Sequence, residues 1–165
     1  MQHLELLLTR YKNKGLLIDT NLLLLYFVGM YDPRRIPKFK RTMIFAVEDF
    51  YTLWNLFKFF DKIITTPNIL TEVNSLANQL ATDLKPDFFS KFSEQLNTLE
   101  EHYVETTKVS VSVHFPKLGL TDSGILDLAK NQYLVLSDDF RLVGYLGKQG
   151  IDAINFNYIR TLNWR

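Results

Sequence analysis

The chain has 165 residues, with 19 Lys and Arg against 18 Asp and Glu, no Cys, and 47% hydrophobic residues. This composition is typical of one folded globular domain and excludes an intrinsically disordered chain. A domain of this length can be stable without disulfides, and the lack of Cys removes thiolate nucleophiles and Cys-ligated zinc or iron–sulfur sites. A formal net charge of +1 excludes a global attraction to nucleic acid or membranes, so such binding would need a local patch.

The amino-acid pattern contains neither a membrane segment nor a secretory leader. The longest apolar run, residues 22–28, is far shorter than the roughly 20 residues of a membrane-spanning helix. The first residues lack the basic start and the small-residue cleavage site of a secretory signal. We therefore expect a cytoplasmic protein that does not interact with membranes.

Short apolar runs separated by amphipathic segments predict alternating strands and helices. Buried strands are predicted where an apolar run stops at a polar residue, at residues 15–18, 62–65, 133–136 and 153–156. Helices are predicted from caps and apolar spacing, over about 19–29, 47–57, 67–80, 87–103, 121–131 and 140–147. Gly29 is expected to end the first of these helices. Residues 108–115 alternate like a strand but are polar enough to form a loop.

Strands without polar alternation, each followed by a helix, are typical of a parallel sheet covered on both faces. The sequence shows no repeat, linker or low-complexity segment that would divide the chain. We therefore predict one α/β domain over residues 1–165, with a three-layer α/β/α architecture and a central parallel sheet. Residues 29–62 are interpreted as a basic and aromatic helical insertion within this domain.

Carboxylates stand directly after two of the predicted strands. Asp19 follows the first strand, and Asp138 and Asp139 follow the strand at 133–136. The carboxyl ends of parallel strands form the ligand crevice of such sheets, so these acids should meet there. Each of them alone is more often a helix cap or a turn residue. Their shared position at one edge is what favours a site.

Two further acids are expected at the same edge. Glu72 lies in the helix that begins at Pro67, beside its apolar stripe, and Asp122 opens the helix that Thr121 is expected to cap. Alone, Glu72 would be a solvated helix residue and Asp122 a first-turn acid that balances the helix dipole. Together with the strand-end acids, they predict a cluster of carboxylates.

Such a cluster needs a cation. At roughly 5 Å and an effective dielectric of about 20, each pair of like charges costs about 3 kcal/mol, so several pairs would rival a folding free energy of about 5–15 kcal/mol. The three His residues, His3, His102 and His114, show no metal-ligand spacing. Oxygen ligands alone favour Mg²⁺ or Mn²⁺, which support the hydrolysis of phosphodiesters by a metal-activated water.

Four segments of the chain resemble, in their order, the motifs of the PIN-domain ribonucleases, and especially of the VapC-type toxins of bacterial toxin–antitoxin pairs. They are Leu-Ile-Asp-Thr-Asn at 17–21, Thr-Pro-Asn-Ile-Leu-Thr-Glu-Val at 66–73, Gly-Leu-Thr-Asp at 119–122 and Leu-Ser-Asp-Asp at 136–139. Each segment is weak alone, but the ordered set is fairly specific and covers most of the chain. The stretch from 29 to 62 is longer than in compact members of the family.

The resemblance implies a metal-dependent endoribonuclease that uses Mg²⁺ or Mn²⁺. It implies that the catalytic and metal-binding acids are Asp19, Glu72, Asp122 and Asp139, with Asp138 as an alternative that matches the last motif less well. It also implies that Asn21 and Ser137 orient a carboxylate or the attacking water. Such a protein would act on an RNA substrate, form a homodimer, for which the aromatic residues at 50–60 offer a surface, and could have a small antitoxin as partner.

A basic run follows the first predicted helix. Its cations, which could track a phosphate backbone, are Arg34, Arg35, Lys38, Lys40 and Arg41. Phe39 within the run could stack on a base, which would make the run an RNA-binding segment. The alternative interpretation is a solvated loop.

Two other functions compete with the nuclease. The first is a catalytically silent PIN-like module that binds RNA or protein, against which the complete set of four acids argues. The second is a phospho-aspartate receiver or phosphatase with Asp19 as nucleophile. That chemistry favours a second aspartate two residues later, where this chain has Asn21.

Overall fold

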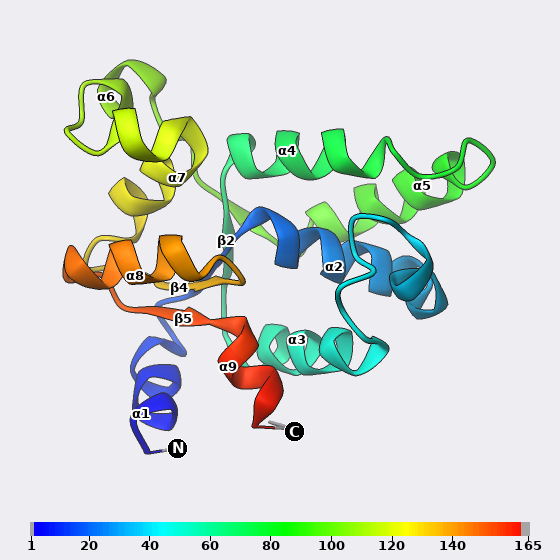
Figure 1. The fold of residues 1–165 in the computed structure, drawn as a ribbon, viewed down its shortest axis with the longest axis horizontal. Helices are drawn as coiled ribbons and strands as arrows, with labels where there is room; N and C mark the ends of the chain where they lie inside the picture. The colour runs from blue at the N-terminus through cyan, green and yellow to red at the C-terminus, as the bar shows by residue number, and fades with distance from the viewer. Residues whose placement is uncertain (1, 163–165) are drawn as a thin grey trace.

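The computed structural model describes residues 2–162 and shows an α/β fold around a five-stranded sheet in which every pair of neighbouring strands is parallel (Figure 1). The order across the sheet is β3-β2-β1-β4-β5. The strands are β1 (Leu16–Ile18), β2 (Ile63–Thr65), β3 (Glu100–Glu101), β4 (Leu134–Ser137) and β5 (Ala153–Asn155). The predicted α/β fold with a central parallel sheet is therefore confirmed, and the four predicted strands all belong to it.

Helices connect the strands and pack around the sheet (Figure 1). They are α1 (Gln2–Tyr11), α2 (Thr20–Tyr31), the 3-10 helix η1 (Pro33–Lys38), α3 (Val47–Phe59), α4 (Pro67–Ala77), α5 (Lys85–Leu96), α6 (Thr106–Ser110), α7 (Phe115–Ala129), α8 (Phe140–Lys148) and α9 (Phe156–Thr161). Within residues 2–162, none of these helices combines the length and the apolar character needed to cross a bilayer.

The central strand β1 fixes the place of the candidate site. Its three residues are fully buried, and it pairs with β2 on one side and β4 on the other, with Leu16 opposite both Ile63 and Leu134. Because these strands are parallel and in register, their carboxyl ends open on one edge of the sheet. The residues that follow β1, β2 and β4 are therefore neighbours in space.

Helix α2 runs through the middle of the molecule, and its residues 22–29 are all buried (Figure 1). Gly29 does not end this helix as predicted, because the helix continues to Tyr31. Its small size instead admits the ring of Phe50 from α3, which would lie only 2.1 Å from a Cβ atom at position 29. The glycine that predicts a helix end from the sequence therefore serves here to let α2 and α3 pack closely.

Gly29→Ala is expected to lower the free energy of unfolding by about 3 kcal/mol, because the added methyl group overlaps a buried ring that other aromatic rings surround. Gly144→Ala is the matched control. No atom lies within 4 Å of a Cβ atom there, so this exposed helical site should become more stable by roughly 0.5–1 kcal/mol. Urea unfolding of both variants measures the difference, and equal effects would contradict the packing described for Gly29.

Three other predicted elements differ from the structure. The helix expected over 87–103 ends at Leu96, and the chain then enters the short strand β3. Residues 106–110 form helix α6 and not a strand; only Val109 of that helix is buried, while Val111 and Val113 beyond it are exposed. The helix expected to begin at Thr121 begins at Phe115 and bends at Gly119, whose φ of 72° lies in the left-handed region.

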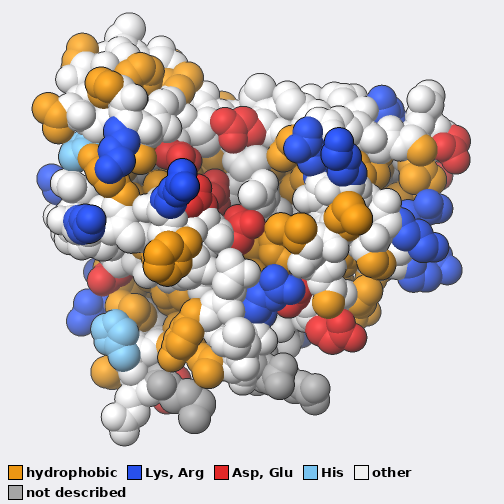
Figure 2. All heavy atoms as spheres, viewed as in Figure 1, with side chains coloured by type: hydrophobic (Ala, Val, Ile, Leu, Met, Phe, Trp, Pro, Cys, Tyr) orange, Lys and Arg blue, Asp and Glu red, His pale blue; other side chains and the backbone are white. Residues whose placement is uncertain are grey.

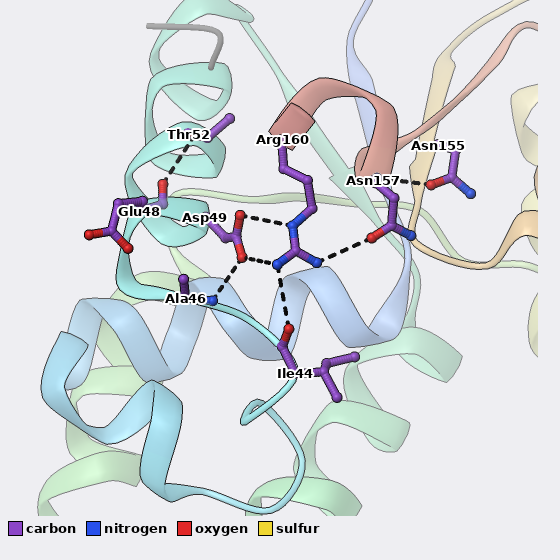
Figure 3. A network of polar contacts seen from close by, with 8 residues as sticks. All are labelled: Ile44, Ala46, Glu48, Asp49, Thr52, Asn155, Asn157 and Arg160. Atoms are coloured by element: carbon purple, nitrogen blue, oxygen red, sulfur yellow. Dashed lines mark hydrogen bonds and ion pairs between the residues drawn. The ribbon is translucent and has the colours of Figure 1, made fainter. Parts of the chain in front are cut away.

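A partly buried ion pair fastens α9 to the first turn of α3 (Figure 3). Arg160 Nη2 lies 2.6 Å from Asp49 Oδ2, and Arg160 Nε donates to Asp49 Oδ1 at 3.0 Å. The Asp49 carboxylate also accepts a hydrogen bond from the Ala46 backbone N–H. One turn earlier in α9, Asn157 Nδ2 donates to the backbone carbonyl of Asp138 at 3.2 Å. The insertion at 29–62 and the strand-end acids are therefore tied to the same short helix.

Candidate active site

Asp19 stands at the end of β1 and caps α2. Its Oδ1 accepts a hydrogen bond from the Thr20 backbone N–H at 2.7 Å, and its Oδ2 accepts one from Ser137 Oγ at 2.6 Å. The residue is buried, with 9% of its surface exposed. Burial raises the pKa of the Asp19 carboxyl, against the two hydrogen bonds that lower it, and the nearby charges of Asp138 and Asp139 raise it further.

Glu72 reaches the same edge from α4, and two threonines hold its carboxylate. Thr20 Oγ1 donates to Oε2 at 2.9 Å, and Thr121 Oγ1 donates to Oε1 at 2.6 Å. Both oxygens of an otherwise exposed side chain are thereby fixed. The two hydroxyls join the starts of α2 and of the second part of α7 to α4.

Asp122 lies next to Thr121, just after the bend at Gly119. Its pKa is raised from 3.8 to about 7, first by burial and then by the charges of Asp19, Glu72 and Asp139. Asp122 shares one surface hollow with Glu72 and another with Asp139, and Ser137 contacts both Asp139 and Asp19, so the four acids predicted from the sequence lie near one another. We call Asp19, Glu72, Asp122 and Asp139 the acidic crevice.

The last two acids have different partners. Asp139 caps α8, where its Oδ1 accepts hydrogen bonds from the backbone N–H groups of Arg141 and Leu142, and its own N–H donates to Ser137 Oγ at 3.0 Å. Ser137 therefore contacts both Asp19 and Asp139. Asn21, in contrast, contacts Asp138, with Nδ2 3.4 Å from each of its carboxylate oxygens. Burial raises the pKa of Asp138.

Three of the four acids, Glu72, Asp122 and Asp139, line two adjoining hollows in the surface. One, of about 480 Å³, lies between α4 and the bend of α7 and includes Glu72 and Asp122. The other, of about 620 Å³, lies between α7 and α8 and includes Asp122 and Asp139. Because Leu118 and Asp122 line both, the hollows form one crevice, and Figure 2 shows acidic side chains gathered in the middle of this face.

The donor chemistry of the crevice suits a hard divalent cation, since its groups are carboxylates and hydroxyls. Hydrogen bonds fix the carboxylates of Asp19 and Glu72, and burial with mutual repulsion opposes the ionisation of Asp122. In this arrangement, no group of three or more His, Asp and Glu side chains within residues 2–162 is positioned to hold a metal ion. The residues fit Mg²⁺ or Mn²⁺ by type, but the carboxylates would have to draw together around the ion to coordinate it.

The predicted basic run lies at the other end of α2. This helix has 12 residues, so its ends are about 18 Å apart, and Figure 1 shows it leading away from the strand ends toward η1. Arg34 and Arg35 pair with Asp32, and Arg41 Nε donates to Gln79. Lys38 and Lys40 are exposed. Phe39, expected to stack on a base, is instead buried with 7% of its surface exposed, because it packs into the core.

The aromatic residues at 50–60 are mostly part of the core. Phe50, Phe57 and Phe60 are buried, and Phe57 stacks on Tyr26 of α2. The aromatic side chains that α3 exposes are Tyr51 and Trp54, and the Lys58 ammonium lies 3.5 Å from the centre of the Trp54 ring. The surface expected to support a homodimer is therefore narrower than the sequence suggests.

Sequence reasoning missed the two threonines that hold Glu72. The sequence predicts only a capping role for Thr121 and no separate role for Thr20, although Thr20 directly follows Asp19 and Thr121 directly precedes Asp122. That adjacency was the available signal. The pairing itself joins residues about fifty positions apart and follows only from the fold.

The structure has an α/β fold with a five-stranded parallel sheet, and Glu72, Asp122 and Asp139 line adjoining hollows in its surface. Protein-family models, curated proteins and solved structures were all compared with the chain, and none of them matches it.

Proposed function

We propose that the protein is a metal-dependent endoribonuclease of the PIN type that hydrolyses RNA with Mg²⁺ or Mn²⁺. The observation that carries the proposal is the convergence of Asp19, Glu72, Asp122 and Asp139 on one crevice from four separate elements. Burial first, and then the charges of the other three acids, raise the pKa of Asp122 to about 7, and a bound cation would favour its ionised form. The four motifs at 17–21, 66–73, 119–122 and 136–139 support the family assignment.

The chain's own residues would position the reaction. A bound divalent ion supplies a water of lowered pKa and a positive charge beside the phosphate. Ser137 holds Asp19 and Asp139 in a fixed relation, and the two threonines hold Glu72 at the crevice wall. In this proposal Glu72 would orient the attacking water, and the scissile phosphate would sit beside Asp122, which lines both hollows.

The test is RNA cleavage by the purified protein with defined metals. We expect cleavage of unstructured RNA with Mg²⁺ or Mn²⁺, its complete loss in EDTA, and its return when Mn²⁺ is added in excess, because the acids alone repel a phosphodiester. A preparation of the Asp19→Asn variant made in parallel controls for contaminating ribonucleases. Undiminished cleavage in chelator would refute the metal mechanism, and binding of RNA without cleavage under any metal would favour the silent module.

A further inference from the structure

The wall of the crevice formed by α7 and α8 carries a set of cations that the sequence does not group together. Lys117 comes from the first turn of α7, and Arg141 and Lys148 come from the two ends of α8. All three line the hollow of about 620 Å³ that contains Asp122 and Asp139. Figure 2 shows Lys and Arg side chains beside the acidic group on this face. We call these three cations, with Phe140, the basic flank.

The cations of the basic flank are not neutralised by the acids beside them. Among residues 2–162, Lys117, Arg141 and Lys148 form no ion pair, whereas Arg34 and Arg35 of the basic run pair with Asp32. All three side chains are exposed to solvent. They are therefore free to contact an anion that lies beside the acidic crevice.

Phe140 adds an aromatic surface at the edge of the acidic crevice. It follows Asp139 directly and is 80% exposed, which is unusual for Phe. The backbone N–H groups of Arg141 and Leu142 are already used by the Asp139 cap. Recognition at this end of α8 would therefore come from side chains, with the ring of Phe140 and the guanidinium of Arg141 as neighbours.

The wall that carries Lys117 is fixed. His114 Nδ1 and Tyr145 Oη lie 2.6 Å apart, which joins the start of α7 to α8. Lys117 Nζ lies 4.6 Å from the centre of the same Tyr145 ring. The bend at Gly119 separates this first turn from the part of α7 that carries Asp122. The cation and the acid therefore line one shared hollow from two parts of the same helix.

We propose that the basic flank binds the single-stranded RNA on one side of the cleaved bond, with an unpaired base stacked on Phe140 and adjacent phosphates contacted by Lys117, Arg141 and Lys148. This inference rests on the proposed nuclease function and names the part of the protein that holds its substrate. A base within a duplex is already stacked and cannot cover Phe140, so the flank selects unpaired RNA. The basic run at 34–41 is then not the main RNA-binding surface.

Binding without cleavage tests the flank. The wild type is titrated in EDTA with a fluorescent single-stranded RNA, and with the same RNA annealed to its complement, by fluorescence anisotropy at several salt concentrations. Phe140→Ala should raise the Kd for the single strand about 10-fold and leave the Kd for the duplex unchanged, while Phe140→Tyr should bind like the wild type. Arg141→Ala with Lys148→Ala should lower the slope of log K against log salt by about 0.7 for each lost contact.

A charge-matched control lies at the opposite edge of the sheet. Lys12→Ala with Lys14→Ala removes two exposed cations just before β1 and should leave both Kd and the salt slope unchanged. Unchanged binding in the Phe140→Ala and Arg141/Lys148 variants, or an equal loss in the Lys12/Lys14 control, would overturn the inference. Metal-dependent cleavage by the wild type is measured separately. If the wild type cleaves RNA but the flank variants bind RNA normally, the proposed nuclease function is supported and only the role of the basic flank is refuted.

Discussion

Asp19→Asn is expected to lower the kcat of RNA cleavage by on the order of 10²–10³-fold while the protein stays folded, since it removes one charge from the site where the phosphate reacts. The fold is retained because Asn can replace both hydrogen bonds: its Oδ1 accepts from the Thr20 N–H, and its amide donates to Ser137 Oγ. Rates are measured at saturating RNA and Mn²⁺, with circular dichroism as the check on folding.

Asp61→Asn is the matched control for this loss. Asp61 is exposed and precedes β2, at the amino edge of the sheet and away from the crevice. Its substitution changes the net charge equally and should leave cleavage at the wild-type rate. A folded Asp19→Asn protein that cleaves as fast as the wild type would show that Asp19 is a helix cap without a catalytic role.

Asp122→Asn is expected to raise the free energy of unfolding of the metal-free protein by about 2 kcal/mol at pH 8, after the shift in pKa is discounted for solvent screening. The folded-state pKa of Asp122, about 7, lies above its ordinary value of 3.8, so the fold favours the protonated form. The wild type therefore loses stability as the pH rises from about 4 to about 7, and this penalty persists above pH 7. The Asn side chain cannot ionise and avoids it.

Urea midpoints at pH 4 and pH 8, with and without Mg²⁺, measure this effect. At pH 4 the two proteins should be nearly equally stable, because Asp122 is then largely protonated in the folded state. Mg²⁺ should stabilise the wild type more than the variant, which has lost a ligand. Asp127→Asn is the control on the same helix, where the side chain is exposed and its replacement should have little effect at either pH. A variant less stable than the wild type at pH 8 would disprove the crowding of carboxylates at Asp122.

Local signals in the sequence were sufficient for the elements that frame the crevice. The apolar run at 16–18 predicts a strand, and the Asp19 that follows it predicts the cap of the next helix. Thr66 before Pro67 predicts a second helix cap. The structure contains this strand and both caps. Strand β3 has no such signal, because Glu100 and Glu101 are charged and are held by backbone pairing to Ile64 and Thr65. Such an edge strand can be identified only from its pairing with β2 in the folded structure.

The candidate site was only partly accessible from the sequence, for a similar reason. Acids that follow strands could be assigned to one edge because parallel strands end together. A cluster of cations could be recognised only where the cations lie close together in the sequence, as at 34–41. The sequence therefore favoured, as the RNA-binding segment, a run that lies at the far end of α2 from the acids. Lys117, Arg141 and Lys148 are dispersed along the chain and come together only through the packing of α7 on α8, with His114 and Tyr145 at the contact.

The order of strands also determines when the crevice is completed during synthesis. β1 can pair with β2 early, but its other edge stays open until β4 has been made, since the strand order is β3-β2-β1-β4-β5. Ser137 and Asp139, which contact one another across the end of β4, are therefore added to Asp19 late. A nascent chain that has not yet been extended to β4 lacks these groups. The topology thus delays the assembly of the proposed catalytic centre until β4 has been made.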